Sequence, residues 1–214
     1  DWKHSRLDRT EPRARFKTGT AFKPFVYATG FSNGRYPGTR GDDSPIDNRY
    51  VMIGGTSGIL AEWGSESLDN SYEGWITARR ALYRSKDAAT VRFGLSVGLE
   101  NVVKLAENAG IQFLTEMREF PATFLGNSEV SITEMARAYT IFPNGGSRPN
   151  RTFIVKEIRD PDGNVEFRED EDHPVDVTDP YSTWQVHSAL KEVMTQGPGV
   201  DAINKYGLED IPAV

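Results

Sequence analysis

Hydrophobic residues recur every three or four positions over much of the chain, the spacing of one face of a helix. The first such run holds Ala21, Phe22, Phe25, Val26 and Ala28. Pro24 falls inside this run, and proline is tolerated in the first turn of a helix because its missing N–H would have no intrahelical partner there. We therefore predict that the first helix begins near Thr20.

Further helices are predicted downstream. A helical pattern starts at Thr77 and continues to Gly110, a C-cap, through apolar positions at Ala78, Ala81, Leu82, Val91, Leu95, Val97, Leu99, Val103, Leu105 and Ala106. Ser131 and Glu134 form the sequence signature of a capping box, and the apolar face behind it holds Met135, Ala138, Tyr139 and Phe142. A last helix is expected from Pro180 to Met194, with Trp184, Val186, Leu190 and Val193 buried.

The remaining segments are predicted to be loops and a hairpin. Residues 30–50 are rich in Gly, Pro, Asp, Asn and Arg and indicate a long surface loop. Residues 153–155 and 165–167 are β-rich and flank Asp160-Pro161-Asp162-Gly163, a turn sequence, so we expect a β-hairpin. Asp160 and Asp162 are also spaced like the start of a calcium loop, but the other ligand positions are missing.

Composition excludes several classes of function. The 214 residues carry 25 Lys and Arg against 31 Asp and Glu, and a net charge of −6 disfavours nonspecific nucleic-acid binding. No apolar run exceeds about five residues, whereas a membrane span needs roughly 20. The absence of cysteine rules out disulfides and thiolate chemistry, and three scattered histidines make a metal site unexpected. We predict neither a metal nor a cofactor.

Thr20 and Lys23 are the first candidates for chemistry. At positions i and i+3 they would be neighbours on one helix face. A neutral lysine amine can take the proton of a hydroxyl, and the positive end of a helix dipole favours the resulting oxygen anion. On spacing alone, an N-cap threonine and a solvated lysine explain the pair equally well.

The surrounding residues resemble the transpeptidase domains of penicillin-binding proteins. Gly19-Thr20-x-Phe22-Lys23-Pro24-Phe25 is similar to their first motif, a form of the Ser-x-x-Lys pattern. Ser85-x-Asp87 is similar to the second motif, Ser-x-Asn, and follows a matching run from Tyr72-Glu73-Gly74 to Ala81-Leu82. The most diagnostic block comprises Gly126, Glu129, Val130, Ser131, Glu134, Met135, Ala136, Ala138, Tyr139, Phe142, Asn144, Gly145 and Gly146.

The resemblance implies an α+β fold and a peptidoglycan DD-transpeptidase-like activity of the class A, bifunctional type. In this family the first-motif serine attacks a D-Ala-D-Ala peptide carbonyl, the motif lysine handles its proton, and the second-motif serine orients the lysine; β-lactams acylate the same serine. Carried over, the catalytic positions are Thr20, Lys23, Ser85 and Asp87. The implied partners are peptidoglycan stem peptides and β-lactams, on the periplasmic or extracytoplasmic face of a bacterial inner membrane.

Two of these four positions depart from the family pattern. Thr20 replaces serine, and its extra methyl group stiffens χ1 and crowds the approach to a carbonyl. Asp87 replaces asparagine, so it loses the amide donor and adds a negative charge that could keep Lys23 protonated. A protonated lysine cannot act as a base.

The resemblance also implies that residues 1–214 are a partial transpeptidase domain. The third motif, Lys-Thr/Ser-Gly, would follow Val214, and no glycosyltransferase domain is present. We therefore expect mostly the helical part of the fold, an incomplete antiparallel sheet that another chain could complete, and no activity from this fragment.

Two functions stay open: a transpeptidase whose parent protein is active, or a degenerate domain that binds or scaffolds. A carbohydrate-acting carboxylate pair among Glu62, Glu66 and Asp69 beside Trp63 is a weaker alternative, because these residues fall in a loop that matches the family's linker.

Overall fold

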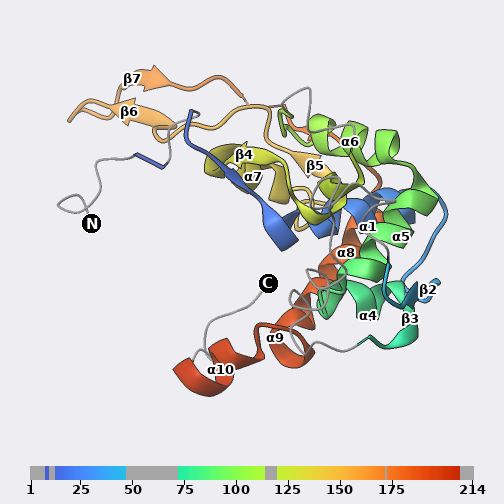
Figure 1. The fold of residues 1–214 in the computed structure, drawn as a ribbon. Helices are drawn as coiled ribbons and strands as arrows, with labels where there is room; N and C mark the ends of the chain where they lie inside the picture. Colours follow the sequence, from blue (N-terminus) through green and yellow to red (C-terminus); the bar gives the residue numbers. More distant parts are fainter. Residues whose placement is uncertain (1–7, 10–12, 47–71, 114–119, 172, 208–214) are drawn as a thin grey trace.

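The computed structural model describes residues 8–9, 13–46, 72–113, 120–171 and 173–207. Figure 1 shows a helical body with short strands at its periphery. Its elements run in the order β1 (Arg15–Lys17), η1 (Gly19–Phe22), α1 (Lys23–Ser32), β2 (Arg40–Asp43), β3 (Gly74–Thr77), α4 (Ala78–Tyr83), α5 (Asp87–Val97), α6 (Leu99–Asn108) and η3 (Pro121–Leu125). They continue with β4 (Glu129–Ser131), α7 (Ile132–Tyr139), β5 (Ser147–Arg148), β6 (Glu157–Arg159), β7 (Val165–Arg168), β8 (Val175–Asp176), α8 (Pro180–Lys191), α9 (Val193–Gln196) and α10 (Val200–Tyr206).

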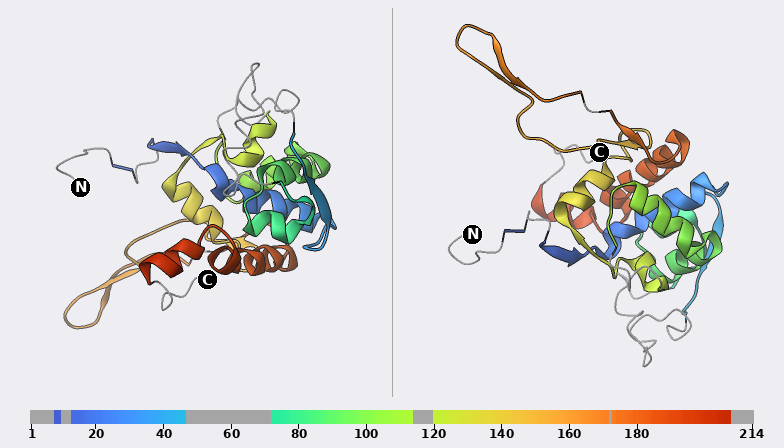
Figure 2. Two further views of the ribbon diagram at one scale, coloured as in Figure 1. Left: turned by 60° about the horizontal axis from the view of Figure 1, so that its bottom comes forward. Right: turned by 90° about the horizontal axis from the view of Figure 1, so that it is seen from above.

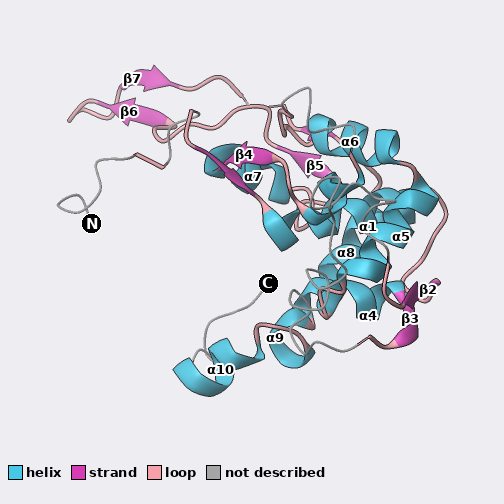
Figure 3. Ribbon diagram, in the orientation of Figure 1, coloured by secondary structure: helices cyan, strands magenta, loops and turns pink. Residues whose placement is uncertain are grey.

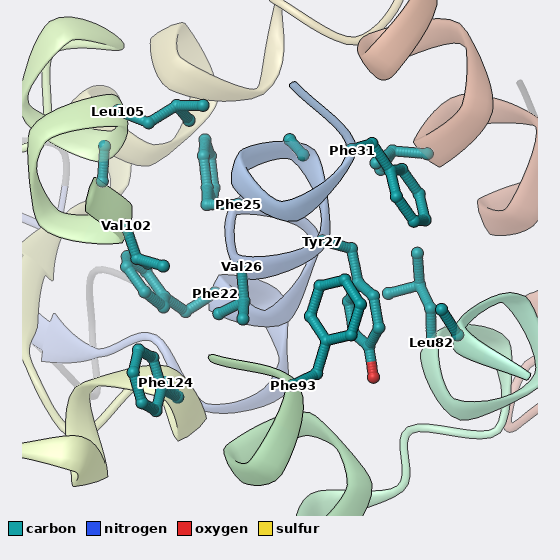
Figure 4. Close-up of a cluster of buried hydrophobic side chains, with 14 of the residues drawn as sticks. Phe22, Phe25, Val26, Tyr27, Phe31, Leu82, Phe93, Val102, Leu105 and Phe124 are labelled. Carbon is teal, nitrogen blue, oxygen red and sulfur yellow. The ribbon is translucent and has the colours of Figure 1, made fainter. Parts of the chain in front are cut away.

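Helix α1 forms the centre of the body. It contacts α8, α5 and α6, and its residues from Lys23 to Phe31 are all buried. Figure 4 shows its side chains surrounded by those of the neighbouring elements. Tyr27 stacks on Phe93 of α5 with ring centroids 4.7 Å apart, and Phe25 contacts Tyr139 and Phe142 edge-on or tilted. A helix buried on all sides gains most of its stability from this packing.

The strands of the described residues form four separate antiparallel pairs: β1 with β4, β2 with β3, β5 with β8, and β6 with β7 (Figure 3). The architecture is therefore α+β, as predicted. The β6–β7 hairpin stands clear of the helical body in both views of Figure 2. Its Ile158 and Phe167 face each other across the two strands and are about half exposed.

Several sequence predictions are confirmed. Ser131 and Glu134 form both hydrogen bonds of a capping box at the start of α7. Gly110 lies just beyond α6 with a φ of +101°, the conformation that a glycine after a helix supplies. The turn of the hairpin is closed by the Asp160 N–H, which donates to the Asn164 carbonyl at 2.9 Å.

Other predictions are wrong in detail. Helix α1 begins at Lys23 rather than near Thr20, because residues 19–22 form a tighter 3₁₀ turn. Arg40–Asp43 is a strand within the predicted surface loop, held by pairing with β3. The first hairpin strand is Glu157–Arg159, not residues 153–155, and Leu95 and Trp184 are exposed.

The acidic residues Glu62, Glu66 and Asp69 and the neighbouring Trp63 lie outside the described residues, as does the segment from 208 to 214.

Candidate functional site

Thr20 and Lys23 lie on two consecutive elements at one end of the central helix. Thr20 is exposed within η1, whereas Lys23, the first residue of α1, is 1% exposed. The turn between them is closed by the Lys23 N–H, which donates to the Thr20 carbonyl. Within the described part of the chain, the Thr20 hydroxyl makes no hydrogen bond. An accessible hydroxyl therefore precedes a deeply buried lysine by one turn.

The residues after η3 support this turn from behind. The Gly19 N–H donates to the Gly126 carbonyl at 3.0 Å, and the Thr18 N–H donates to the Ser128 carbonyl at 3.3 Å. Gly126 has a φ of +74°, and a Cβ there would come within 2.1 Å of the Gly19 carbonyl oxygen. Only glycine permits both that backbone angle and that approach. This explains why Gly126 belongs to the most diagnostic sequence block.

Ser85 lies in the turn between α4 and α5, with a φ of +59°. Its N–H donates to the Leu82 carbonyl at 3.0 Å, and the Lys86 N–H donates to the Ala81 carbonyl at 2.9 Å. These two bonds are those of a Schellman motif, in which the left-handed position is usually glycine. Among the described residues, Ser85 is the single non-glycine residue with a positive φ.

The Lys23 ammonium contacts two of the other predicted residues, Ser85 and Asp87. Its Nζ donates to the Ser85 carbonyl at 2.7 Å, to Ser85 Oγ at 2.9 Å, and to Asp87 Oδ1 in a short ion pair. Asp87, 8% exposed, is the first residue of α5. The structure thus brings Lys23, Ser85 and Asp87 into direct contact and places Thr20 one turn away.

The geometry of this cluster is that of a buried ion pair. The Lys23 ammonium lies against the Asp87 carboxylate, and opposite charges in contact attract each other. Two charges at this depth are tolerated because each neutralises the other and further hydrogen bonds satisfy the ammonium. In this arrangement the amine of Lys23 donates hydrogen bonds to Asp87 and to the carbonyl and hydroxyl oxygens of Ser85.

A second buried ionic cluster, which the sequence interpretation did not include, adjoins the first. The Lys86 ammonium, with its residue 2% exposed, lies 3.2 Å from Glu73 Oε1 and 3.7 Å from Asp43 Oδ2. Glu73 also accepts from Arg80 Nε at 2.5 Å. Lys86 lies between two predicted site residues, Ser85 and Asp87, and this position could have drawn attention to it. Lysine side chains are rarely buried, however, so the sequence favoured an exposed Lys86.

The pKa values of the two carboxyl groups move in opposite directions. Burial raises the pKa of Asp43, and the hydrogen bond from the Glu73 N–H and the charge of Lys86 offset this only in part. Burial also acts to raise the pKa of Glu73, but hydrogen bonds from Arg80 and Lys86 outweigh it and leave that pKa lowered. The cluster is therefore anchored by an ionised Glu73.

Two tyrosines join the site to the core. The Tyr27 hydroxyl lies 3.0 Å from Thr90 Oγ1, and its pKa is raised, chiefly by burial and further by the charges of Asp43 and Asp87. The Tyr139 hydroxyl donates to the Ala21 carbonyl at 2.6 Å and so holds the turn that carries Thr20. One carboxyl group from each ionic cluster, Asp43 and Asp87, thus acts electrostatically on the same buried Tyr27 hydroxyl.

The described residues hold no group of three or more His, Asp or Glu side chains arranged to bind a metal. Asp160 uses its carboxylate on Asn164, accepting from both its backbone and its side-chain N–H at 2.8 Å. None of the helices described is long and apolar enough to cross a membrane.

Comparison with known proteins identifies similar sequences and folds. Residues 13–209 match the model of the family described as penicillin binding protein transpeptidase domain. Penicillin-binding protein 1A of Neisseria meningitidis is 31% identical over 165 residues, covering 76% of this chain and 19% of the relative. Its counterpart from Rickettsia conorii is 29% identical over 224 residues, covering 94% of this chain and 27% of the relative. The chain therefore spans only 19% and 27% of the length of these two relatives.

Two solved structures show the same fold. The crystal structure of penicillin-binding protein 1A from Haemophilus influenzae has a TM-score of 0.74 at 20% identity, covering 94% of this chain and 33% of that one. Penicillin-binding protein A from Mycobacterium tuberculosis, as an imipenem acyl-enzyme complex, has a TM-score of 0.69 at 18% identity, covering 94% of this chain and 47% of that one.

Proposed function

Since the chain belongs to the penicillin-binding protein transpeptidase family, we propose that it recognises peptidoglycan stem peptides at the Lys23 cluster but does not acylate them as it stands. The observation that carries this proposal is the ion pair between Lys23 Nζ and Asp87 Oδ1. On this proposal, the domain has the fold of a cell-wall transpeptidase and binds stem peptides without forming an acyl-enzyme. Its natural place would be the extracytoplasmic face of a bacterial membrane, where stem peptides are found.

Acyl transfer would require Lys23 to accept a proton. The Thr20 oxygen would bond to the peptide carbonyl carbon while its proton passes to a basic group; the amide C–N bond then breaks, and the leaving amine takes a proton. A Lys23 amine that is protonated by its contact with Asp87 has no free electron pair for the first transfer. The Thr20 methyl group adds crowding at the same step.

Acyl transfer through Thr20 is the second candidate function. It is favoured by the exposure of Thr20 and by its position one turn before Lys23, where a substrate carbonyl could reach the hydroxyl. In this case Asp87 would slow the reaction without abolishing it. The same experiment separates the two candidates.

The test is labelling with fluorescent penicillin, followed by intact-mass measurement, on this chain and on the longest natural protein that contains it. We expect no adduct on the natural sequence, none or a trace on T20S or D87N alone, and a stoichiometric adduct on T20S/D87N in the longer protein. T20S/D87N/K23M is the matched control and should stay unlabelled. A stoichiometric adduct on Thr20 of the natural sequence would refute the binding-only proposal and establish the second candidate.

We further propose that another segment or chain completes the sheet. The four described strand pairs each contain two strands, and a two-stranded pair is marginal by itself in water. Sedimentation of this chain alone and of the longer protein tests this idea: a self-associating chain and a monomeric longer protein are expected, and two stable monomers would contradict it.

A further inference from the structure

The left-handed backbone conformation of Ser85 is unfavourable for a residue other than glycine and needs a structural explanation. Its left-handed φ of +59° disfavours any residue with a Cβ, and the equivalent place in a Schellman motif is normally filled by glycine. Yet the hydroxyl of Ser85 reaches Lys23 from this conformation, at 2.9 Å. Something in the structure must hold the turn against its own backbone preference.

The next residue, Lys86, is fixed at both its backbone and its side chain. Its carbonyl accepts from the Thr90 N–H at 3.1 Å and from Thr90 Oγ1 at 2.6 Å. Its ammonium is bound by Glu73 and Asp43, and Asp43 belongs to strand β2. In a Schellman motif this position frequently makes an apolar contact with the helix, whereas here its side chain forms buried ion pairs.

The partners of Lys86 are themselves held in place. The Glu73 N–H donates to Asp43 Oδ2 at 3.1 Å, and Arg80 Nε donates to Glu73 Oε2 at 2.5 Å. Strand β2 pairs with β3 in the register Asp43 with Gly74, next to Glu73. The ammonium thus ties the turn to a small sheet that precedes α4.

We propose that Lys86 is a positioning residue of the site: its buried ammonium, bound by Asp43 and Glu73, holds the Ser85–Asp87 turn in the conformation that places Ser85 and Asp87 on Lys23. The inference rests on the same site as the proposed function but not on its chemistry. It predicts that the geometry around Lys23 depends on the ion pairs that Lys86 forms with Asp43 and Glu73.

The test reads out geometry and needs no substrate. The backbone ¹³Cα and amide shifts of Ser85 report its φ, and the hydrogen exchange of the Lys23 ammonium, observed after ¹⁵N-lysine labelling, reports its contacts. We expect K86M to shift the Ser85 signals toward those of an extended residue and to speed Lys23 exchange at least tenfold. K86R should restore most of both signals, because it keeps a cation between Asp43 and Glu73.

Two controls separate positioning from simple loss of stability. K205M removes an exposed lysine that pairs with Asp201, and it should change neither signal. V103A, a buried residue of α6, should lower the melting temperature without shifting Ser85. If K86M behaves like V103A, with a lower melting temperature and unshifted Ser85 signals, Lys86 is only structural and the proposal is overturned.

A glycine at position 85 provides the sharpest check. Glycine adopts a positive φ freely, so K86M should speed Lys23 exchange much less in an S85G background than in the natural sequence; S85G alone is the reference, because it also removes the bond to Ser85 Oγ. An equal fold-change from K86M in the two backgrounds would refute the proposal. Penicillin labelling is a separate readout, so a failure of the proposed function leaves this result interpretable, and the reverse also holds.

Discussion

Ion pairs in the helical body and in the β6–β7 hairpin have the same chemistry but different consequences. In the body, Lys23 and Asp87 have side chains 2% and 9% exposed. In the hairpin, Glu157 accepts from Arg159 and from Arg168, whose side chains are 50% and 60% exposed. Water solvates the hairpin charges whether or not they pair, whereas the body charges depend on each other.

The difference shows which charges define a conformation. Breaking a buried pair leaves a charge without solvent, so the buried pairs allow one arrangement of the turn around Ser85. The register of the hairpin is set by backbone pairing of its strands and by its turn. Its ion pairs form because this register places the charged side chains next to each other. We therefore expect substitutions to separate the two regions by effect size.

Removing one carboxylate from each region should give the largest contrast. D87A leaves the Lys23 ammonium buried without its counter-ion and should lower the free energy of unfolding by about 3–5 kcal/mol. E157A removes a carboxylate from the exposed hairpin and should leave the urea midpoint within error. Urea denaturation at neutral pH measures both, and similar losses in the two variants would contradict the comparison.

A purely steric substitution in the helical body should cause the next largest loss of unfolding free energy. G126A must place a methyl group against the Gly19 carbonyl and keep a left-handed backbone, so we expect a loss of roughly 2–3 kcal/mol. G34A is the matched control: it has a φ of +84° but no atom within 4 Å of its Cβ position. It should lose only the backbone part, about 1–2 kcal/mol. Equal losses would show that the close approach at Gly126 is unimportant.

A neutral hydrogen bond at the same depth tests whether depth or charge matters more. T90V removes the hydroxyl that pairs with the Tyr27 hydroxyl and donates to the Lys86 carbonyl, and it should cost about 1–2 kcal/mol of unfolding free energy. The double variant Y27F/T90V removes both polar groups and should recover part of that loss. A loss from T90V as large as that from D87A would show that burial alone, without charge, accounts for the effect.

The sequence predicted the helices and three residues of the ionic cluster for different reasons. Periodicity located α4, α6 and α7 because each buries one apolar face. The family resemblance selected Lys23, Ser85 and Asp87; Lys23 lies more than 60 positions from the other two in the chain, yet it contacts both in the structure. No spacing rule could have joined them.

The rest depends on tertiary contacts that leave no local signal. Strand β2 is made of Arg40-Gly41-Asp42-Asp43, a polar run, and it is held by β3 and by Arg92, which donates to the carbonyls of Asp42 and Ser44. Trp184 reads as a core residue but is 67% exposed. Lys86 lies between two predicted site residues, but lysine is usually a surface residue, and its burial at 2% exposure depends on tertiary contacts.

The smallest expected effect is a difference in pH dependence between single carboxyl groups. Hydrogen bonds from Arg159 and Arg168 lower the pKa of Glu157, so its contribution to stability is present above the unfolded pKa and is lost as the pH falls through the folded value. Burial raises the pKa of Asp43, so the folded state binds that proton more tightly, and stability falls as the pH rises from the unfolded to the folded pKa.

Carboxyl ¹³C titration by NMR should place the midpoint of Asp43 above the ordinary value of 3.8 and that of Glu157 below 4.5. High salt should move Glu157 toward its ordinary value and affect Asp43 less, because exposed charges are screened more strongly. A salt response of equal size at both groups would mean that water reaches Asp43 as freely as it reaches the hairpin, and the contrast between the two regions would then fail.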